Sequence, residues 1–554
     1  MQKIKSISEY FFLIWKFFLF KLKIFYFTSN FYNKKISNNL PSKFNYRPSL
    51  HIINSLTSFN KKKIKIESYS LNSLWKLSSK NKLEFQNLHN FLWLTFLDIK
   101  TNKAPAQTII ENWIDNNNDF NEETWKLDIL SKRLIAWISN SNLTLDESGL
   151  KYKEKFILSI TKQANHLSMN IVSLEDDENK LTCCSSLILV GLAFKNHYKH
   201  YKSGLSILQK FIKNNFDNSG FPKSRNPEEL MACLKYLILI KEWIKESQNQ
   251  IPDYLEEIIF NCGKSYSFLS KNLNELPLFN GSSEIKNEEF EKYLNYLNYN
   301  FNDNSKEKNG YVIFKDKKIV FIMDIGNSPD FKYSKKYQSG CLSFEITSNK
   351  EKLICNLGFD INKNNKIKLL SRSTAAHSTL YLNNHSSCIF RTSYPFKIHH
   401  ENRLREGLKI VKKKIVSEKD FENIIASHNG YQNRYGYIHE RSIKFIKKEK
   451  IFLGIDNLIK NTKASNISYG IRFHIYPGIK IVKTQNSQSI LLSLKNGEGW
   501  KFGCHNKEVL IEKGIYLGNK NKIIENENIY ICIPYVLTDV KNEEKSKYFC
   551  LHVW

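Results

Sequence analysis

Hydrophobic residues recur at helical spacing through the first half of the chain, from about residue 68 to residue 275. One such set, separated by intervals of 3, 4 and 3, consists of Leu127, Leu130, Leu134 and Trp137. This spacing places the set on one face of a helix. Further helical runs cover residues 185–194 and 228–243. Several amphipathic helices joined by short polar loops predict an all-α domain. Periodicity leaves open whether they close into a barrel or stack into a solenoid.

The pattern changes after a stretch rich in Asn, Glu and Lys, which covers about residues 282 to 310 and is predicted to be a linker. Short runs of β-branched and aromatic residues follow, separated by turn residues, and the last of them is residues 551–554. The first of these runs are residues 310–314, 318–324, 342–347 and 352–356. Runs of this kind predict an antiparallel β-sandwich built from many hairpins.

The N-terminal segment is apolar and aromatic from Tyr10 onward, but Lys16, Lys21 and Lys23 interrupt it. The uninterrupted run is too short for a membrane span, and no small-residue cleavage site follows it. No cleavable signal peptide is therefore expected. Two interpretations stay open: a first helix packed against the protein, or a basic, aromatic helix that lies on an anionic membrane surface.

A length of 554 residues predicts two or three domains, and 41% hydrophobic residues provide enough apolar material for folded cores. The net charge of +29 would attract polyanions. However, Lys, Asn, Ile, Phe and Tyr are abundant in every region, which is typical of an A+T-rich coding sequence. The densest basic run, residues 61–65, is short, and no nucleic-acid-binding motif is present. We therefore expect no nucleic-acid partner.

The ten cysteines are irregularly spaced and include no C-x-x-C pair, which argues against a disulfide framework and against thioredoxin-like or zinc-ribbon chemistry. Cys183 and Cys184 are adjacent in an apolar helical run. We expect both to be buried thiols.

Residues 371–382 read Ser-Arg-Ser-Thr-Ala-Ala-His-Ser-Thr-Leu-Tyr-Leu. This segment resembles the hallmark strand of heparinase II/III-like proteins, in which an Arg precedes Thr-Ala-Ala-His. Blocks at residues 339–345, 426–441 and 470–478 agree with the family in the same order. Thinner similarity is found at residues 88–93, 132–137 and 278–281.

The resemblance covers about residues 45 to 554 and implies a multidomain α + β protein. It predicts an incomplete α/α barrel (toroid) at residues 46–300 and an antiparallel β-sandwich at residues 301–554. Residues 1–45 fall outside the resemblance and form a separate basic aromatic segment. The implied activity is that of a carbon–oxygen lyase that cleaves acidic polysaccharides by β-elimination. Such an enzyme must neutralise a uronate carboxylate, remove the C5 proton and protonate the departing oxygen.

In the family, Asn and His side chains steady the carboxylate, and Tyr and His move protons, in a cleft between barrel and sandwich. By this resemblance the catalytic candidates are His377, Asn165, His166 and Tyr431. We expect His377 to face the cleft, where imidazole can act as acid or base near neutral pH. An ordinary packed histidine is the alternative for His377, and an exposed helical pair is the alternative for Asn165 and His166.

The candidates for substrate binding are Arg372, His428, Arg434 and Arg225, and a purely structural role is the alternative for His428. Some family members bind a structural zinc ion in the sandwich through histidines and an aspartate. Here residues 383–385 read Asn-Asn-His without an Asp. We therefore expect no required cofactor, while a structural zinc stays an alternative.

The main departure from the family pattern lies in residues 217–229, where active lyases carry a loop followed shortly by a catalytic tyrosine. This loop contains no tyrosine, and the next one, Tyr236, falls in an apolar helical run typical of packing. Three interpretations follow: a sandwich residue such as Tyr431 transfers the proton, the reaction differs, or the protein binds glycan without cleaving it.

We expect the partner to be an acidic polysaccharide or oligosaccharide, with peripheral membrane contact through the N-terminal segment. The main alternative function is a non-catalytic glycan-binding or envelope-assembly protein that retains the lyase fold. The resemblance favours the cell envelope or periplasm as the location, and the cytoplasm is the alternative.

Overall fold

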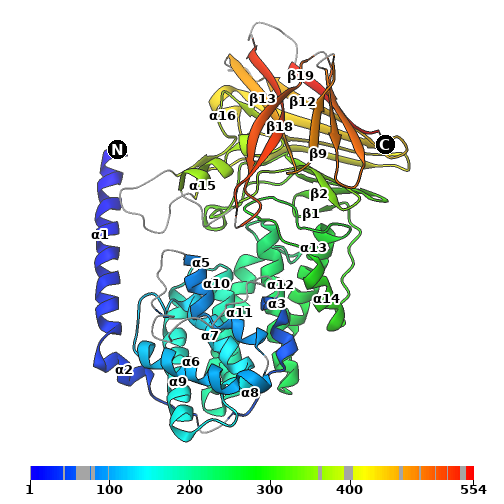
Figure 1. Cartoon of the computed structure of the whole chain (residues 1–554). Helices are drawn as coiled ribbons and strands as arrows, with labels where there is room; N and C mark the ends of the chain where they lie inside the picture. Colours follow the sequence, from blue (N-terminus) through cyan, green and yellow to red (C-terminus); the bar gives the residue numbers. More distant parts are fainter. Residues whose placement is uncertain are drawn as a thin grey trace. The chain divides into compact units, whose positions relative to one another are not determined.

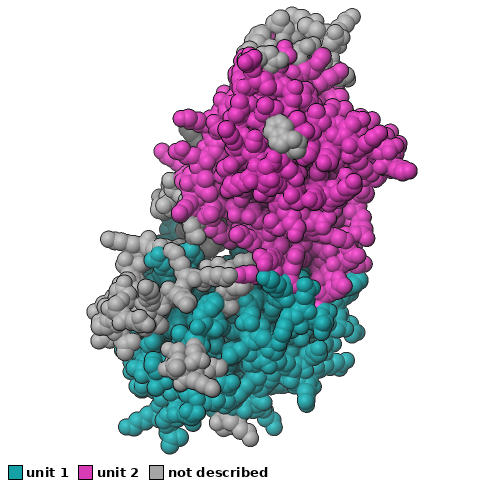
Figure 2. Space-filling view, turned by 45° about the vertical axis from the view of Figure 1, so that its right-hand side comes forward, with its two compact units in different colours: residues 1–216, 232–260, 292–298 teal, residues 217–231, 261–291, 299–554 magenta. Residues whose placement is uncertain are grey.

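The computed structural model describes residues 2–41, 44–57, 75, 82–97, 99–359, 365–391, 403–460, 466–485, 488–505, 507–520, 522–536 and 544–553. The chain forms two compact units, which are coloured separately in Figure 2. Unit 1 comprises Met1–Phe216, Ala232–Phe260 and Lys292–Asn298, and unit 2 comprises Asp217–Met231, Asn261–Glu291 and Tyr299–Trp554. The basic run at residues 61–65 lies outside the described residues.

Helices come first along the chain, and strands follow (Figure 1). The α-helices before the first strand are α1 (Gln2–Phe27), α2 (Asn30–Ile36), α3 (Asn54–Thr57), α5 (Lys82–His89), α6 (Ile99–Asn117), α7 (Leu127–Ser139), α8 (Ser141–Thr144), α9 (Leu150–Asn170), α10 (Glu178–Ala193), α11 (Tyr198–Asn215), α12 (Pro227–Glu246), α13 (Asp253–Ser270) and α14 (Glu288–Tyr296). Later helices are α15 (Asn365–Ser371) and α16 (Gln432–Tyr435). Short 3-10 turns are η1 (Leu50–Ile53), η2 (Leu92–Phe96), η3 (Ile171–Ser173), η4 (Lys195–His197), η5 (Phe331–Tyr333) and η6 (Thr374–Ala376).

The helices of unit 1 bury the apolar faces that their sequences predict. Leu130, Leu134 and Trp137 of α7 are fully buried, as the 3–4 spacing requires. Helix α10 begins where the Asp177 carboxylate accepts a hydrogen bond from the backbone N–H of Asn179, and both Cys183 and Cys184 are buried as predicted. All ten cysteines are free thiols.

The predicted linker between residues 282 and 310 is wrong in part, because it contains helix α14. Its first turn carries Glu288, Glu289 and Glu291, which favour a helix N-terminus. The apolar side chains of Phe290, Tyr293 and Leu294, at i, i+3 and i+4, are buried. Acidic residues hid this short apolar stripe in the sequence.

Unit 2 contains two large antiparallel sheets. The nine-stranded sheet has the order β1 (Glu307–Lys308), β2 (Tyr311–Asp316), β3 (Ile319–Asp324), β4 (Phe344–Ser348), β5 (Glu351–Cys355), β13 (Ile467–Ile475), β18 (Ile524–Val536) and β17 (Leu510–Tyr516), with β6 (Leu380–Leu382) also paired to β13. The eight-stranded sheet has the order β14 (Lys480–Lys483), β15 (Ser489–Ser493), β16 (Gly499–Cys504), β19 (Glu544–His552), β12 (Ile451–Lys460), β11 (Tyr437–Ile446), β10 (Phe421–His428) and β9 (Ile410–Ser417). A small third sheet pairs β7 (Ile389–Phe390) with β8 (Leu404–Glu406).

The two large sheets pack face to face through one hydrophobic core, which makes unit 2 a β-sandwich. The rings of Phe321 on β3 and Phe452 on β12 lie 5.5 Å apart, and those of Phe473 on β13 and Phe502 on β16 lie 4.8 Å apart. Strand β11 alternates strictly between buried and half-buried side chains. The predicted strands and sandwich are confirmed.

Helix α1 differs from the other long helices, because many of its large apolar side chains are exposed. Trp15, Phe18 and Phe25 are 58%, 52% and 77% exposed. Among the described helices, none is both long and apolar enough to cross a membrane.

Candidate functional site

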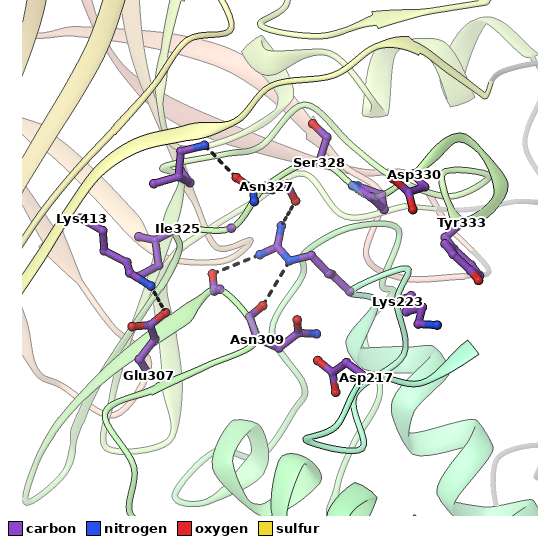
Figure 3. Close-up of a pocket in the computed structure, with 15 residues that line it drawn as sticks. Asp217, Lys223, Glu307, Asn309, Ile325, Asn327, Ser328, Asp330, Tyr333 and Lys413 are labelled. Atoms are coloured by element: carbon purple, nitrogen blue, oxygen red, sulfur yellow. Dashed lines mark hydrogen bonds and ion pairs between the residues drawn. The ribbon is translucent and has the colours of Figure 1, made fainter. Parts of the chain in front are cut away.

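A pocket of about 410 Å³ lies in unit 2, beside the loop in which the expected tyrosine is missing (Figure 3). Its lining includes residues of that loop, of the strand ends near β1 and β3, of the segment that leads to η5, and of β9. The ionisable residues in the lining are Asp217, Lys223, Arg225, Glu307, Asp330, Tyr333 and Lys413. Such a mixture of cations, carboxylates and a phenol is typical of a site for a polar, charged ligand.

The loop is fixed by its own polar side chains. The Oδ1 atom of Asp217 accepts hydrogen bonds from the backbone N–H groups of Ser219 and Phe221, both at 2.9 Å. Gly220 has a φ of +72°, and an added Cβ would lie 2.5 Å from the backbone of Asn261. At the other end of the loop, the Oδ1 atom of Asn226 accepts from the backbone N–H of Glu229 at 3.0 Å, which caps α12. The loop therefore presents Lys223 from a rigid backbone.

Arg225 lines the pocket, but its guanidinium is engaged inside the protein. Nε donates to the carbonyl of Asn309, Nη1 to that of Asn327, and Nη2 to that of Gly310, at 3.1 to 3.2 Å. Nη2 also donates to Asp324 at 2.5 Å. Burial opposes the charge, but the Asp324 carboxylate raises the pKa of Arg225 above its ordinary value. These bonds make Arg225 part of the pocket wall; its predicted role in substrate binding stays a prediction.

Tyr333 is the residue that sequence reasoning missed. It ends η5 and is half-buried in the pocket lining. The ammonium groups of Lys223 and Lys332 lie 5.8 and 5.3 Å from its ring centroid. About 110 positions separate Tyr333 from Lys223, so only the folded chain brings them together. The single signal in the sequence was the basic, aromatic character of residues 331–337.

The opposite wall of the pocket carries a further cation. Lys413 on β9 is exposed and pairs with Glu307 on β1, as the dashed line in Figure 3 shows. A phenol beside several ammonium groups can exchange a proton while the cations neutralise negative charge on a bound molecule.

His377 is enclosed within unit 2 and is only 1% exposed. Its Nδ1 atom lies 2.8 Å from the carbonyl oxygen of Ser373, and its Nε2 atom has no hydrogen-bond partner among the described residues. The ring packs against Gly340, where an added Cβ would lie 2.5 Å from ring atom Cδ2. Burial lowers the pKa of His377 to about 4. The ring is therefore buried and not open to solvent, and the catalytic role of His377 stays a prediction.

Asn165 and His166 are both buried in unit 1, so the alternative of an exposed helical pair is wrong. Asn165 Nδ2 donates to the carbonyls of Ile36 and Asn38, at 2.7 and 3.0 Å. His166 Nδ1 lies 2.7 Å from the hydroxyl of Tyr32. Burial lowers the pKa of His166 to about 3. These contacts tie α9 to the chain around α2.

Tyr431 and Arg372 are also buried. The Tyr431 hydroxyl donates to the carbonyl of Leu380 at 3.3 Å, and burial raises the pKa of the phenol. Arg372 donates to the carbonyls of Tyr337 and Ser334, at 2.7 and 2.8 Å. Of the predicted site residues, Arg434 on α16 is the one with an exposed side chain, which lies beside the ring of Tyr435.

His428 belongs to a buried polar chain. Its Nε2 lies 3.3 Å from Nδ1 of His439, and Nε2 of His439 lies 2.6 Å from Oδ1 of Asp456. Arg441 donates to both oxygens of Asp456. These contacts fit the structural role for His428.

The same residues do not fit a zinc ion. The two histidines face each other instead of converging on one centre, and Asp456 is engaged by Arg441. Within the described part of the chain, no group of three His, Cys, Asp or Glu side chains could hold a metal.

Comparisons with known proteins identify the architecture. Residues 300–547 match the family model for the C-terminal domain of heparinase II/III-like proteins. Three solved structures share the fold. A heparinase III described as the BT4657 gene product has 16% identity and a TM-score of 0.65, and the match covers 92% of this chain and 84% of that one. A further heparinase III has 14% identity and a TM-score of 0.67, with coverage of 93% and 86%, and a mutant of the heparan sulfate lyase HepC from Pedobacter heparinus has 15% identity and a TM-score of 0.62, with coverage of 89% and 78%. No curated protein matches the sequence. The predicted helical toroid followed by an antiparallel sandwich is confirmed.

Proposed function

Because this chain belongs to the heparinase II/III-like family, we propose that it is a polysaccharide lyase that cleaves uronate-containing glycans by β-elimination. Members of this family are polysaccharide lyases. The observation that supports activity here is that Tyr333 lines a pocket together with Lys223, because this pocket offers a tyrosine where the loop at residues 217–229 lacks one.

The residues of the pocket match the steps of the reaction. Lys223 and Lys413 would neutralise the uronate carboxylate, which makes the C5 proton more acidic. Tyr333, in its deprotonated form, would take that proton while a C4=C5 double bond forms and the C4–O bond breaks with its electron pair on the leaving oxygen. The resulting Tyr333 phenol would then donate the proton to this oxygen. His377, Asn165, His166 and Tyr431 stay predictions as catalytic residues.

The test is to incubate the purified full chain with a panel of acidic glycans and follow the ultraviolet absorbance of unsaturated sugar ends. We expect Tyr333→Phe to lower kcat by about 100-fold or more, since general acid–base catalysis contributes about 10²–10⁴-fold. Lys223→Met should mainly raise KM. Tyr296→Phe, at a tyrosine that is 65% exposed, is the matched control.

Two results would count against this proposal. No absorbance with any glycan at high protein concentration would exclude lyase activity on the panel. Full activity of Tyr333→Phe, together with loss of activity in His377→Ala at unchanged stability, would move the catalytic site from the pocket to the buried histidine.

A second candidate function is glycan binding without cleavage. It is favoured by the burial of His377, Asn165, His166 and Tyr431, the four residues that the resemblance assigns to catalysis. Glycan binding that persists unchanged in Tyr333→Phe and His377→Ala, without any unsaturated product, would support it.

We also propose a location in the cell envelope, on the basis of the family resemblance. Fractionation of cells that produce the full chain tests this proposal, and recovery in the cytoplasmic fraction contradicts it.

A further inference from the structure

We propose that helix α1 is a docking surface for an anionic lipid bilayer, on which the helix lies parallel to the membrane plane. The proposal concerns unit 1 and is independent of glycan cleavage. It rests on the position and exposure of the α1 side chains and on the lysines that border them.

Most of the exposed large apolar side chains described in α1 share one face. At about 100° per residue, seven of the nine fall within an arc of about 140°, whereas Phe17 and Phe20 lie outside it. The seven are Ile14, Trp15, Phe18, Leu19, Leu22, Phe25 and Tyr26, with exposures between 37% and 77%. The face continues into α2, where Phe31 is 70% exposed and its ring centroid lies 6.5 Å from that of Tyr26. A contiguous apolar surface of this kind marks an interaction site.

Lysines identify the partner. On the same helical wheel, Lys21 borders one side of the apolar arc, Lys23 borders the other, and both side chains are exposed. Their ammonium groups lie 5.7 and 5.3 Å from the ring centroids of Phe17 and Phe27. An apolar face with aromatic residues, bordered on both sides by cations, is the arrangement of helices that insert into the headgroup region of anionic membranes. A neutral protein surface would leave these charges without complementary groups.

The C-terminal end of α1 is anchored to the body of unit 1. The ring of Phe27 lies 4.9 Å from Phe120 and 5.1 Å from His166. Thr28 and Ser29 then end the helix, with hydroxyl groups that donate to the carbonyls of Phe25 and Tyr26. The membrane-facing residues are therefore held by a structured end.

The experiment is co-sedimentation of the full chain with phosphatidylcholine vesicles, with and without phosphatidylglycerol. We expect binding to the phosphatidylglycerol vesicles only. The triple variant Phe18→Ser, Leu22→Ser, Phe25→Ser should lower the bound fraction at least tenfold, and Lys21→Glu with Lys23→Glu should abolish the preference for anionic lipid. The matched control is Leu150→Ser with Val172→Ser, at apolar residues of unit 1 that are 78% and 73% exposed.

Several outcomes would overturn the proposal: no binding to either vesicle, equal binding to both, or unchanged binding of the triple variant. A further contrary outcome concerns the oligomeric state, which light scattering measures. If the wild-type chain is a dimer that the triple variant converts to a monomer, and neither binds vesicles, the face joins two copies of the chain instead. Circular dichroism confirms that each variant is folded.

Discussion

At the scale of single residues, the buried pair of Arg225 and Asp324 organises the wall of the pocket. The Asp324 carboxylate also accepts from Asn280 Nδ2 and from the backbone N–H of Gly326, both at 3.0 Å. Arg225 has a φ of +61°, in the left-handed region that non-glycine residues seldom adopt. The surrounding hydrogen bonds hold it in this conformation.

We predict that Asp324→Asn destabilises the protein by about 3–5 kcal/mol, because it leaves a buried guanidinium without its counter-charge. Urea unfolding followed by tryptophan fluorescence measures the change. The exposed Asp330→Asn, in the same pocket, should change the free energy of unfolding by less than about 0.5 kcal/mol. Equal effects of the two substitutions would contradict the role given to the ion pair.

The sequence could predict which residue types the site needs but not the direction of each side chain. His377 lies in a correctly identified motif, yet its ring is buried and packs against Gly340, where the missing side chain leaves room for it. Tyr333 could not be predicted, since its neighbour Lys223 is distant in sequence and the two meet only through tertiary structure.

At the scale of elements, α10 and α11 pack closely at Gly191. A Cβ on Gly191 would lie 2.2 Å from the backbone nitrogen of Tyr201, so no larger residue fits without separating the helices. The sequence shows Gly191 only as a glycine in an apolar helix. It cannot show that α11 approaches α10 closely at this residue, because that contact forms only when the two helices pack.

We predict that Gly191→Ala lowers the free energy of unfolding by about 1–3 kcal/mol or more, as overpacked substitutions do. Thermal and urea unfolding measure the effect. Gly149→Ala is the control, because Gly149 has a φ of −67° and no atom within 4 Å of an added Cβ. If Gly191→Ala were as stable as Gly149→Ala, the described packing of α10 on α11 would be incorrect.

Periodicity predicted most helices and strands, since each buries one face against a neighbour. It failed at α14, where acidic residues surround a short apolar stripe. It also could not choose between a barrel and a solenoid, because both bury the same helix faces. The toroid followed from the family resemblance.

At the scale of the whole molecule, many histidines are held uncharged. Burial lowers the pKa of each below the ordinary value of 6.5, to about 3 for His89, His166, His200 and His474 and to about 4 for His197 and His377. When the pH falls below 6.5, the unfolded chain takes up protons at these positions, while the folded chain does so only near pH 3–4.

The stability that these histidines contribute is therefore complete above pH 6.5 and is lost as the pH falls toward 4. We predict a steep decrease of Tm between pH 6.5 and pH 4.5, measured by circular dichroism. His377→Gln should make this decrease shallower, because one titrating group is removed. A constant Tm over this range would show that the rings are accessible to protons in the folded state.

The chain passes between the two units five times, at residues 216/217, 231/232, 260/261, 291/292 and 298/299. A fragment that begins at residue 301 would therefore lack two segments of unit 2, residues 217–231 and 261–291, which contribute contacts to its interior. Asp324 would lose Arg225, and the Glu345 carboxylate would lose the backbone N–H of Leu278. The sandwich is thus not an autonomous module. If it were fused to another protein, the fusion would have to include both segments.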